Sequence, residues 1–303
     1  MVVYWLFRLT ILLTRPLPLW LGYRVAGGVA EICYRFFRRQ RRGLNENMAV
    51  VLGSDDPKEV DAVARRAFRN FGKFVIDFIH FPVMTREEVR RRLVFTQWTE
   101  LDDVMASGRG MLIVTMHFGL WDMGAAALAA YGYPISVVAD SFRYEKLDRL
   151  VHGSREKLGM KIITRERVGL NVFRTLKRGE ILGMVIDVPP EDQVVAVDFL
   201  GAPAEVSAVP ARIALRTGAW VVPSMVLRGP ESDTIIRPIL DTRTVDRYEP
   251  TGDDERDVRE LTRLIMFSFE RFIREHPEQW YLFHPLWPRA GERVVRSVLT
   301  SER

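Results

Sequence analysis

Cysteine is nearly absent from this 303-residue chain, which contains only Cys33. A single thiol excludes a disulfide within the chain and a metal site built from several cysteines. The five histidines show no ligand-like spacing with one another, and no His-Glu-x-x-His pattern occurs. We therefore expect neither a metal nor another bound cofactor, and we take a cytosol-facing location as the default.

The chain also lacks an apolar run long enough to cross a bilayer, which needs about 20 residues in a helix. Arg8, Pro16 and Pro18 interrupt the apolar stretch at the N-terminus. No small-x-small cleavage pattern follows it cleanly, so we do not expect a secretory signal peptide. A glycine-rich phosphate loop and internal repeats are missing as well.

Positive charge is concentrated near the N-terminus. Residues 1–50 hold eight arginines and two acids, a balance of +6, whereas the rest has 36 basic and 37 acidic residues, so the formal net charge is +5. The arginines alternate with Trp, Leu and Phe, which favours helices at the surface of an anionic bilayer. The alternative is a pair of ordinary core helices. Nucleic acid is not an expected partner, because a Trp-Leu-Phe face would be badly exposed in that role.

Beyond residue 42 the sequence is typical of one α/β domain. With 48% hydrophobic residues, the chain can bury one sizeable core. Strand patterns alternate with helical patterns, which predicts a central, mostly parallel or mixed sheet flanked by helices. We expect an N-terminal membrane-associating segment at 1–42, the α/β domain at 43–289 and a tail at 290–303. The expected strands are 111–115, 135–139, 161–163, 181–186, 219–226 and 234–239, and the longer expected helices are 57–81, 146–158, 169–177 and 257–275.

His117 follows the expected strand at 111–115, and a small-residue helix begins a few positions later. Asp122 would lie in the first turn of that helix, where its carboxylate can reach back to one imidazole nitrogen. The carboxylate would orient the ring and stabilise its charged form, so that the other nitrogen can accept a proton from a hydroxyl. The alternative is structural: His117 would be a hydrogen-bonded core residue, and Asp122 an acid favoured by the helix dipole.

The pair resembles the His-x4-Asp/Glu motif of glycerolipid and lipid A acyltransferases, and other segments extend the resemblance from about Gly43 to Trp287. Together they are similar to bacterial lipid A late acyltransferases and phosphatidylinositol mannoside acyltransferases. Several segments in the same order are more specific than one motif. They are Val138–Arg143, Leu147–Val151, Arg155–Met160, Lys177–Asp187, Val197–Ala204, Ala214–Ala219 and Pro277–Trp287.

Three expected strands are followed by a polar side chain that could be reactive: His117, Asp140 and Asp187. In open α/β sheets, reactive groups collect at the carboxyl ends of the strands. The resemblance implies that Asp187 lies against the catalytic His117, although Val188–Pro190 departs from the polar run that usually follows in the family. Taken alone, either Asp could simply form a strand-ending turn.

The remaining candidate residues would bind substrate. The resemblance places Arg155 in the active-site groove, where its guanidinium would suit a phosphate on the acceptor or donor, and Arg143 is a second candidate. Both arginines could instead be solvated helix residues. We expect Phe118, Trp121 and Phe199 to line an acyl channel, and the alternative for each is plain core.

The resemblance implies transfer of a fatty acyl group from an acyl thioester, on coenzyme A or acyl carrier protein, to a hydroxyl of a membrane glycolipid. The acceptor would be of the phosphatidylinositol mannoside or lipid A type. His117 would act as general base, Asp122 would orient it, and Asp187 would assist from the facing side. The expected location is the cytoplasmic face of the inner membrane, peripheral or monotopic. Two other classes stay open: an acyl-thioester hydrolase with the same base, and a non-catalytic lipid-binding protein.

Overall fold

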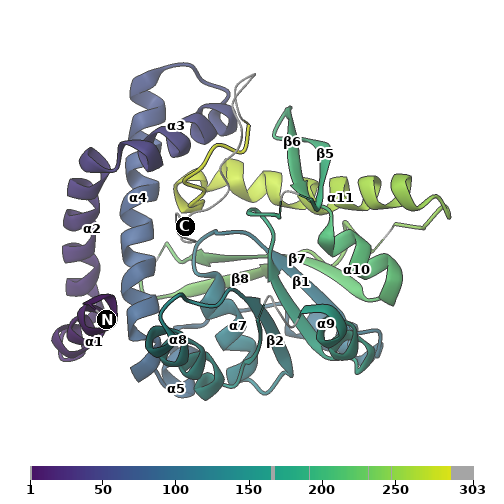
Figure 1. The fold of residues 1–303 in the computed structure, drawn as a ribbon, viewed down its shortest axis with the longest axis horizontal. Helices are drawn as coiled ribbons and strands as arrows, with labels where there is room; N and C mark the ends of the chain where they lie inside the picture. Colours follow the sequence, from purple (N-terminus) through teal and green to yellow (C-terminus); the bar gives the residue numbers. More distant parts are fainter. Residues whose placement is uncertain (1, 165–167, 191, 231, 247, 288–303) are drawn as a thin grey trace.

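A six-stranded sheet forms the centre of the computed structural model, which describes residues 2–164, 168–190, 192–230, 232–246 and 248–287 (Figure 1). The strand order is β3-β2-β4-β1-β7-β8. All neighbouring pairs are parallel except β7 and β8, which are antiparallel. The expected α/β fold with a mostly parallel, mixed sheet is therefore confirmed. The strands are β1 (Met111–Thr115), β2 (Ile135–Ala139), β3 (Lys161–Thr164), β4 (Ile181–Val185), β7 (Trp220–Arg228) and β8 (Ile236–Leu240).

Helices cover both faces of this sheet, and β1 shows how the chain divides its side chains between them. Leu112 and Val114 belong to the buried cluster that contains the inner face of α11, whereas Met111 and Ile113 belong to the cluster under α7. This alternation follows from the strand period of two. Because Met111 to Val114 are buried on both faces of the sheet, this part of β1 is apolar throughout, as parallel strands in α/β proteins usually are.

The longer helices form close to where the sequence predicts them. Their ends follow ordinary capping: Asp56 caps α4 by accepting from the Lys58 amide, and Pro277 follows α11. The helices that pack on the sheet or beside it are α4 (Pro57–His80), α5 (Arg86–Arg92), α6 (Trp98–Ala106), α7 (Trp121–Ala130), α8 (Glu145–Leu158), α9 (Val168–Lys177), α10 (Val209–Thr217) and α11 (Asp254–Glu275), with the 3-10 turns η1 (Phe81–Val83) and η3 (Pro277–Gln279).

A small hairpin outside the main sheet was not predicted. Strands β5 (Val194–Phe199) and β6 (Ala202–Ser207) pair with each other and stand beside α11 (Figure 1). Both turn residues have positive φ, 56° at Leu200 and 88° at Gly201. Leu is an unusual residue for that conformation, so the turn lacks the Asn-Gly or Asp-Gly signal by which such hairpins are recognised in a sequence. Helix α10 was also missed.

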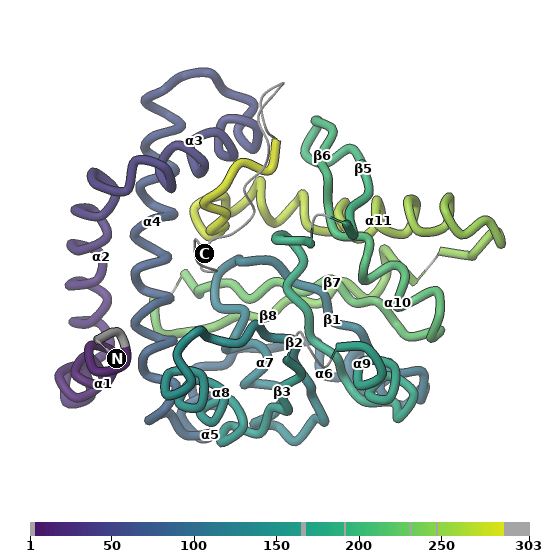
Figure 2. Tube along the Cα trace, viewed as in Figure 1, coloured from purple at the N-terminus to yellow at the C-terminus, as the bar shows by residue number. Residues whose placement is uncertain are grey.

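The N-terminal residues form three helices, α1 (Val2–Thr14), α2 (Leu19–Phe36) and α3 (Arg38–Leu52). The break between α1 and α2 falls at the two expected prolines. Figure 2 shows α2 beside α4 over much of its length. Gly72 on α4 permits this close approach, since a Cβ there would lie 3.0 Å from the Ala26 carbonyl oxygen. None of the described helices is long and apolar enough to cross a membrane.

The expected segment boundary after residue 42 lies inside α3, so the first 42 residues do not end at a break between helices. Helix α2 has a buried side against α4, including Tyr23 and Tyr34, and an exposed apolar side. It therefore has features of both expected alternatives, a core helix and a surface helix. The expected tail at 290–303 lies outside the described residues.

Candidate active site

His117 and Asp187 are brought together by the register of two neighbouring strands. β1 and β4 are parallel, with Thr115 opposite Val185, and each residue of the pair lies two positions beyond that point. Their side chains therefore leave the sheet side by side. Nδ1 of His117 lies 2.7 Å from Oδ1 of Asp187, and the His117 amide donates to Oδ2 at 3.0 Å.

The environment of the two side chains differs, and this difference sets their chemistry. The Asp187 side chain is 1% exposed, whereas that of His117 is 35% exposed. Burial disfavours a charge on the imidazole, but the Asp187 carboxylate, with smaller contributions from Asp122 and Asp140, outweighs burial and raises the pKa of His117 above its ordinary value. Burial likewise opposes the charge of Asp187, and His117 together with the Trp280 indole lowers the pKa of this carboxyl. With Nδ1 turned to Asp187, Nε2 is the nitrogen left to exchange a proton with a substrate.

Asp122 does not orient His117, and this expectation is corrected. Its carboxylate forms a two-point ion pair with Arg155, from Nε at 3.1 Å and from Nη2 at 3.0 Å. Asp122 is the second residue of α7 and faces α8, so the short spacing to His117 in the sequence does not become contact in space. Asp122 still raises the pKa of His117 through its charge. Arg155 is buried and engaged with Asp122, whereas the sequence suggested a guanidinium in a groove, ready for phosphate.

We expect Asp122→Asn to destabilise the protein by roughly 3 to 5 kcal/mol, because it leaves the buried Arg155 charge without its partner. Activity should fall but stay above that of His117→Ala. The double variant Asp122→Asn/Arg155→Met removes both charges and should regain most of the unfolding free energy. Denaturant unfolding of the parent, Asp122→Asn, Arg155→Met and the double variant gives the coupling free energy between the two side chains. Additive effects would show that the pair does not stabilise α7 against α8.

Two further predicted residues, Asp140 and Arg143, are exposed. Asp140 directly follows β2 and is exposed. Since β4 lies between β2 and β1, Asp140 is one strand farther from His117 than Asp187 is, and it acts on His117 as a weaker charge that also raises its pKa. Arg143 is exposed in the turn before α8. The structure therefore groups Asp140 with the pair electrostatically and leaves Arg143 at the surface.

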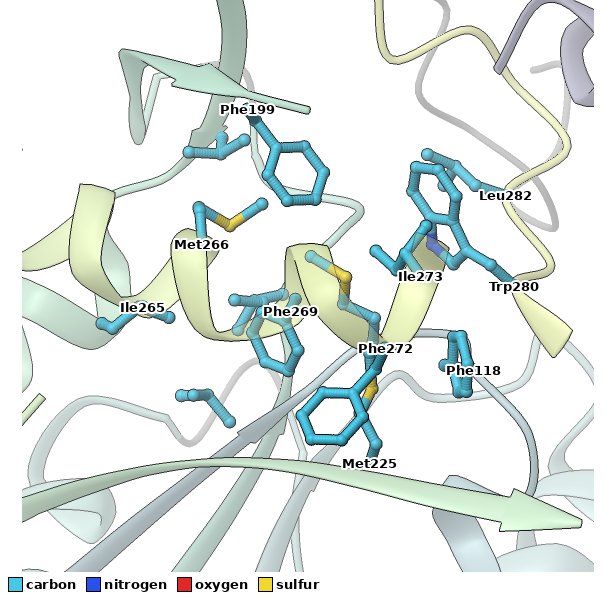
Figure 3. Close-up of a cluster of buried hydrophobic side chains, with 14 of the residues drawn as sticks. Phe118, Phe199, Met225, Ile265, Met266, Phe269, Phe272, Ile273, Trp280 and Leu282 are labelled. Carbon is cyan, nitrogen blue, oxygen red and sulfur yellow. The ribbon is translucent and has the colours of Figure 1, made fainter. Parts of the chain in front are cut away.

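Of the three aromatic residues expected in an acyl channel, only Trp121 lies beside His117. Its ring meets the imidazole edge-on at 5.0 Å between centroids and stacks on Phe74 at 4.0 Å. Phe118 and Phe199 are fully buried. Figure 3 shows them in the core around α11, with Trp280 close by. Both belong to the main buried cluster, in keeping with the core alternative, and a channel role for these two residues stays a prediction.

The segment after α11 holds the His117 loop in place, a role that the sequence did not reveal. The Trp280 indole donates to Asp187 at 3.2 Å, and the Gln279 carbonyl accepts from the Gly119 amide at 2.8 Å. Gly119 has φ +57°, and a Cβ there would lie 1.9 Å from the Val226 carbonyl oxygen, so only glycine fits. The sole signal in the sequence was that Trp280 falls in the last of the family-like segments.

No cluster of three or more His, Cys, Asp or Glu side chains suited to a metal ion occurs within the described ranges. The polar groups described at the site include the His117–Asp187 pair, the Asp122–Arg155 pair, the Trp280 indole and backbone amides. Such a set can accept a proton from a hydroxyl and return it to a leaving group.

Comparison with known proteins identifies the family of this chain. The family described as bacterial lipid A biosynthesis acyltransferase matches residues 1–289, which is nearly the whole chain and contains every residue of the site. The chain belongs to this family. As a member of the lipid A biosynthesis acyltransferase family, it is a lipid acyltransferase.

The similar proteins carry two names, phosphatidylinositol mannoside acyltransferase and lipid A biosynthesis acyltransferase. A phosphatidylinositol mannoside acyltransferase of Mycobacterium tuberculosis (strain CDC 1551 / Oshkosh) is 25% identical over 262 residues, 84% of this chain and 79% of the relative. That of Mycolicibacterium smegmatis is 24% identical, covering 80% and 78% of the two chains. A lipid A biosynthesis acyltransferase of Haemophilus influenzae is 21% identical, covering 90% and 80%. The family resemblance inferred from the motifs is thereby confirmed.

Proposed function

We propose that the protein transfers a fatty acyl group from an acyl thioester, on coenzyme A or acyl carrier protein, to a hydroxyl of a membrane glycolipid. The observation that carries this proposal is the His117–Asp187 pair. It holds the imidazole by Nδ1 against a buried carboxylate and keeps a third of the side chain exposed. A partly exposed base fixed in this way suits a hydroxyl acceptor.

In the proposed reaction, Nε2 of His117 takes the proton of the acceptor hydroxyl as its oxygen attacks the thioester carbonyl carbon. The tetrahedral intermediate collapses by breaking the carbon–sulfur bond, and the leaving thiolate takes the proton back from Nε2. Asp187 stabilises the imidazolium between the two steps and keeps the ring in its orientation. No nucleophile on the enzyme is acylated.

The first turn of α7 is the proposed place for the oxyanion. The amides of Gly119 and Leu120 are already bonded to the carbonyls of Gln279 and Val226. Among the described residues, the amides of Trp121 and Asp122 have no such partner, and they begin α7 next to His117. Free amides at a helix N-terminus stabilise negative charge that develops in a transition state. The Asp122–Arg155 pair would serve by holding this turn in place.

The relatives named above act, by their names, in phosphatidylinositol mannoside acylation and in lipid A biosynthesis, so a glycolipid of either type is the proposed acceptor. The test is incubation of the purified protein with acyl-coenzyme A, with and without a phosphatidylinositol mannoside or a lipid A precursor, followed by mass spectrometry of the lipids. We expect an acylated glycolipid that forms only when acceptor and parent protein are both present. Release of free fatty acid at the same rate without acceptor would identify a hydrolase instead. A protein that binds the lipid but changes neither substrate would be non-catalytic.

We further propose that the outer face of α1 and α2 lies on an anionic lipid surface, without crossing it. Large apolar side chains are exposed along this face, while the opposite side of α1 packs on the domain through Phe7 and Ile11. An exposed apolar face of this extent marks an interaction surface. Its residues are Trp5, Leu6, Leu9, Leu12 and Leu13 on α1, Leu17 before α2, and Trp20, Val25, Val29, Ile32 and Phe36 on α2 with Phe37 after it.

Replacing Trp5, Leu9 and Leu12 with Gln should release the protein from vesicles that contain anionic lipid. These side chains are 60%, 49% and 69% exposed, so the change removes little packing from the folded protein. Each large apolar side chain that enters the lipid contributes about 1.5 to 3 kcal/mol, and we expect at least a tenfold drop in vesicle affinity, measured by flotation. Leu170→Gln/Phe267→Gln is the matched control, since both residues are exposed and apolar but lie on α9 and α11. Equal flotation of the α1 variant and the parent would place the membrane contact elsewhere.

A further inference from the structure

A buried cluster between α2, α4, α5 and β7 carries more positive than negative charge. The Asp77 carboxylate accepts from Arg92 at 2.6 Å and from Arg228 at 2.8 Å, and it also accepts from the Tyr23 hydroxyl at 2.7 Å. Both arginines are less than a tenth exposed. Burial and the Asp77 carboxylate raise the pKa of the Tyr23 hydroxyl, which therefore stays neutral. One carboxylate thus faces two guanidinium groups, and one positive charge is left over.

The donors of Arg92 are not all used. Nε donates to the Thr234 carbonyl at 2.7 Å and Nη2 to Asp77, but Nη1 is buried without a hydrogen-bond partner in the described part of the chain. A buried guanidinium nitrogen without an acceptor is costly, so its environment is expected to supply one. Arg92 also lines a cavity of about 430 Å³ that opens to solvent.

The walls of this cavity contain further donors. It is lined by Leu19, Trp20, Glu88, Arg91, Arg92, Ser232 and Thr234. The hydroxyls of Ser232 and Thr234 lie 2.9 Å apart. Leu19 and Trp20 are the first residues of the 18-residue helix α2, which has no side-chain cap. Their amides have no partner within the ranges that the structure describes, and the dipole of α2 adds positive potential there.

We propose that this cavity binds a phosphate group, carried by a phospholipid headgroup or by free phosphate, between the guanidinium groups of Arg91 and Arg92 and the first turn of α2. Arg92 is held by Asp77 and Thr234 and supplies charge from the buried side, while Arg91 is exposed and closes on the ligand from outside. One of the Ser232 and Thr234 hydroxyls donates to the other, and the remaining O–H completes the set of donors. Phosphate oxygens suit such a combination of arginine, hydroxyl and helix amides.

Glu88 is the one carboxylate of the lining and opposes an anion. The neighbouring Asp233 carboxylate is paired with Lys73 at 2.7 Å. Counting Glu88, Arg91 and Arg92, the charged side chains of the lining keep a net charge of +1. Because Glu88 repels an anion, removing its charge should strengthen phosphate binding.

The first measurement uses the full chain in a buffer without phosphate and titrates inorganic phosphate by calorimetry at constant ionic strength. We expect Arg91→Ala to weaken binding by roughly tenfold or more, since hydrogen bonds to charged groups are among the stronger ones. Glu88→Gln should tighten it. Arg24→Ala is the matched control, because Arg24 is an exposed arginine of α2 that does not line the cavity. Parent-like binding by Arg91→Ala, or none by the parent, would overturn the proposal.

Vesicles then separate the two sources of phosphate. Flotation with phosphatidylglycerol and with phosphatidylcholine vesicles, at matched ionic strength, measures whether Arg91→Ala loses affinity beyond the loss of Arg24→Ala. A larger loss on phosphatidylglycerol assigns the site to a lipid headgroup. If Arg91→Ala loses equal affinity for the two kinds of vesicle, and its binding of inorganic phosphate is weaker than that of the parent, the site is assigned to free phosphate.

This inference is independent of the proposed chemistry at His117. Arg91 lies outside the active site, so Arg91→Ala should keep the parental rate of acyl transfer on substrates presented in detergent. Phosphate binding without any acyl transfer by the parent would leave the site valid and contradict the proposed function. Acyl transfer by the parent without phosphate binding would support the proposed function and contradict the proposed phosphate site.

Discussion

His117→Ala is expected to lower the rate of acyl transfer by roughly 10²- to 10⁴-fold, the usual contribution of a general base. The variant removes a group that combines partial exposure with a fixed carboxylate partner. The measurement is the initial rate of glycolipid acylation by purified protein under saturating donor.

The control must separate lost chemistry from lost folding. His276→Ala makes the same change at a half-buried histidine near the end of α11, whose contact with Glu278 is long at 3.9 Å. We expect this control to retain parental activity and both variants to unfold cooperatively. Turnover by folded His117→Ala within a few-fold of the parent would contradict a base at this position.

Asp187→Asn should have the second largest effect, through the ionisation of His117. The carboxylate stabilises the imidazolium, and an amide of the same shape cannot, so we expect a fall in rate of roughly 10²-fold or more. Asn also leaves the orientation of the ring less defined, because its amide nitrogen can meet Nδ1 as a donor. Since Asp187 is buried, the substitution should be made with a parallel measurement of unfolding free energy.

The pH profile distinguishes this role from a merely structural one. The proposed base must be neutral at Nε2, so the rate of the parent falls as the pH drops below the pKa of His117. Asp187 raises that pKa against the opposing effect of burial. Removing the carboxylate should therefore move the acidic limb of the profile to lower pH. Asp140→Asn, a weaker contributor to the same pKa, should move the limb in the same direction by less. An unchanged limb in Asp187→Asn would show that this carboxylate does not tune the base.

Much of the fold was predictable because local patterns and tertiary packing agree. The strand at 111–115 is apolar at every buried position, and the helix at 57–80 repeats its apolar residues on the side that faces the domain. Where local signals are weak, prediction failed. The β5–β6 hairpin turns at Leu200 and Gly201, and a leucine at positive φ is no turn signal in a sequence.

The partners of charged side chains were harder to predict than the elements that carry them. The sequence places Asp122 closest to His117 along the chain, yet Asp122 pairs with Arg155 and the histidine pairs with Asp187, 70 residues away. The contact between the His117 imidazole and the Asp187 carboxylate follows from the parallel register of β1 and β4. The spacing of residues within one segment does not encode that register. The apolar stretch at the N-terminus was visible too, but which of its side chains stay exposed depends on how α2 lies against α4.

The sequence by itself determined the α/β class, the strand ends that carry His117, Asp140 and Asp187, and the family-like segments that surround them. These are properties of short windows, where hydrophobic period and residue type decide the outcome. Only the tertiary structure decided which carboxylate holds His117, that Phe118 and Phe199 are core, and that Asp77 is shared by Arg92 and Arg228. Those outcomes depend on strand order and on helices packed across long stretches of chain. Charge pairing and burial are set by distances in space, and these distances exist only once the sheet has formed.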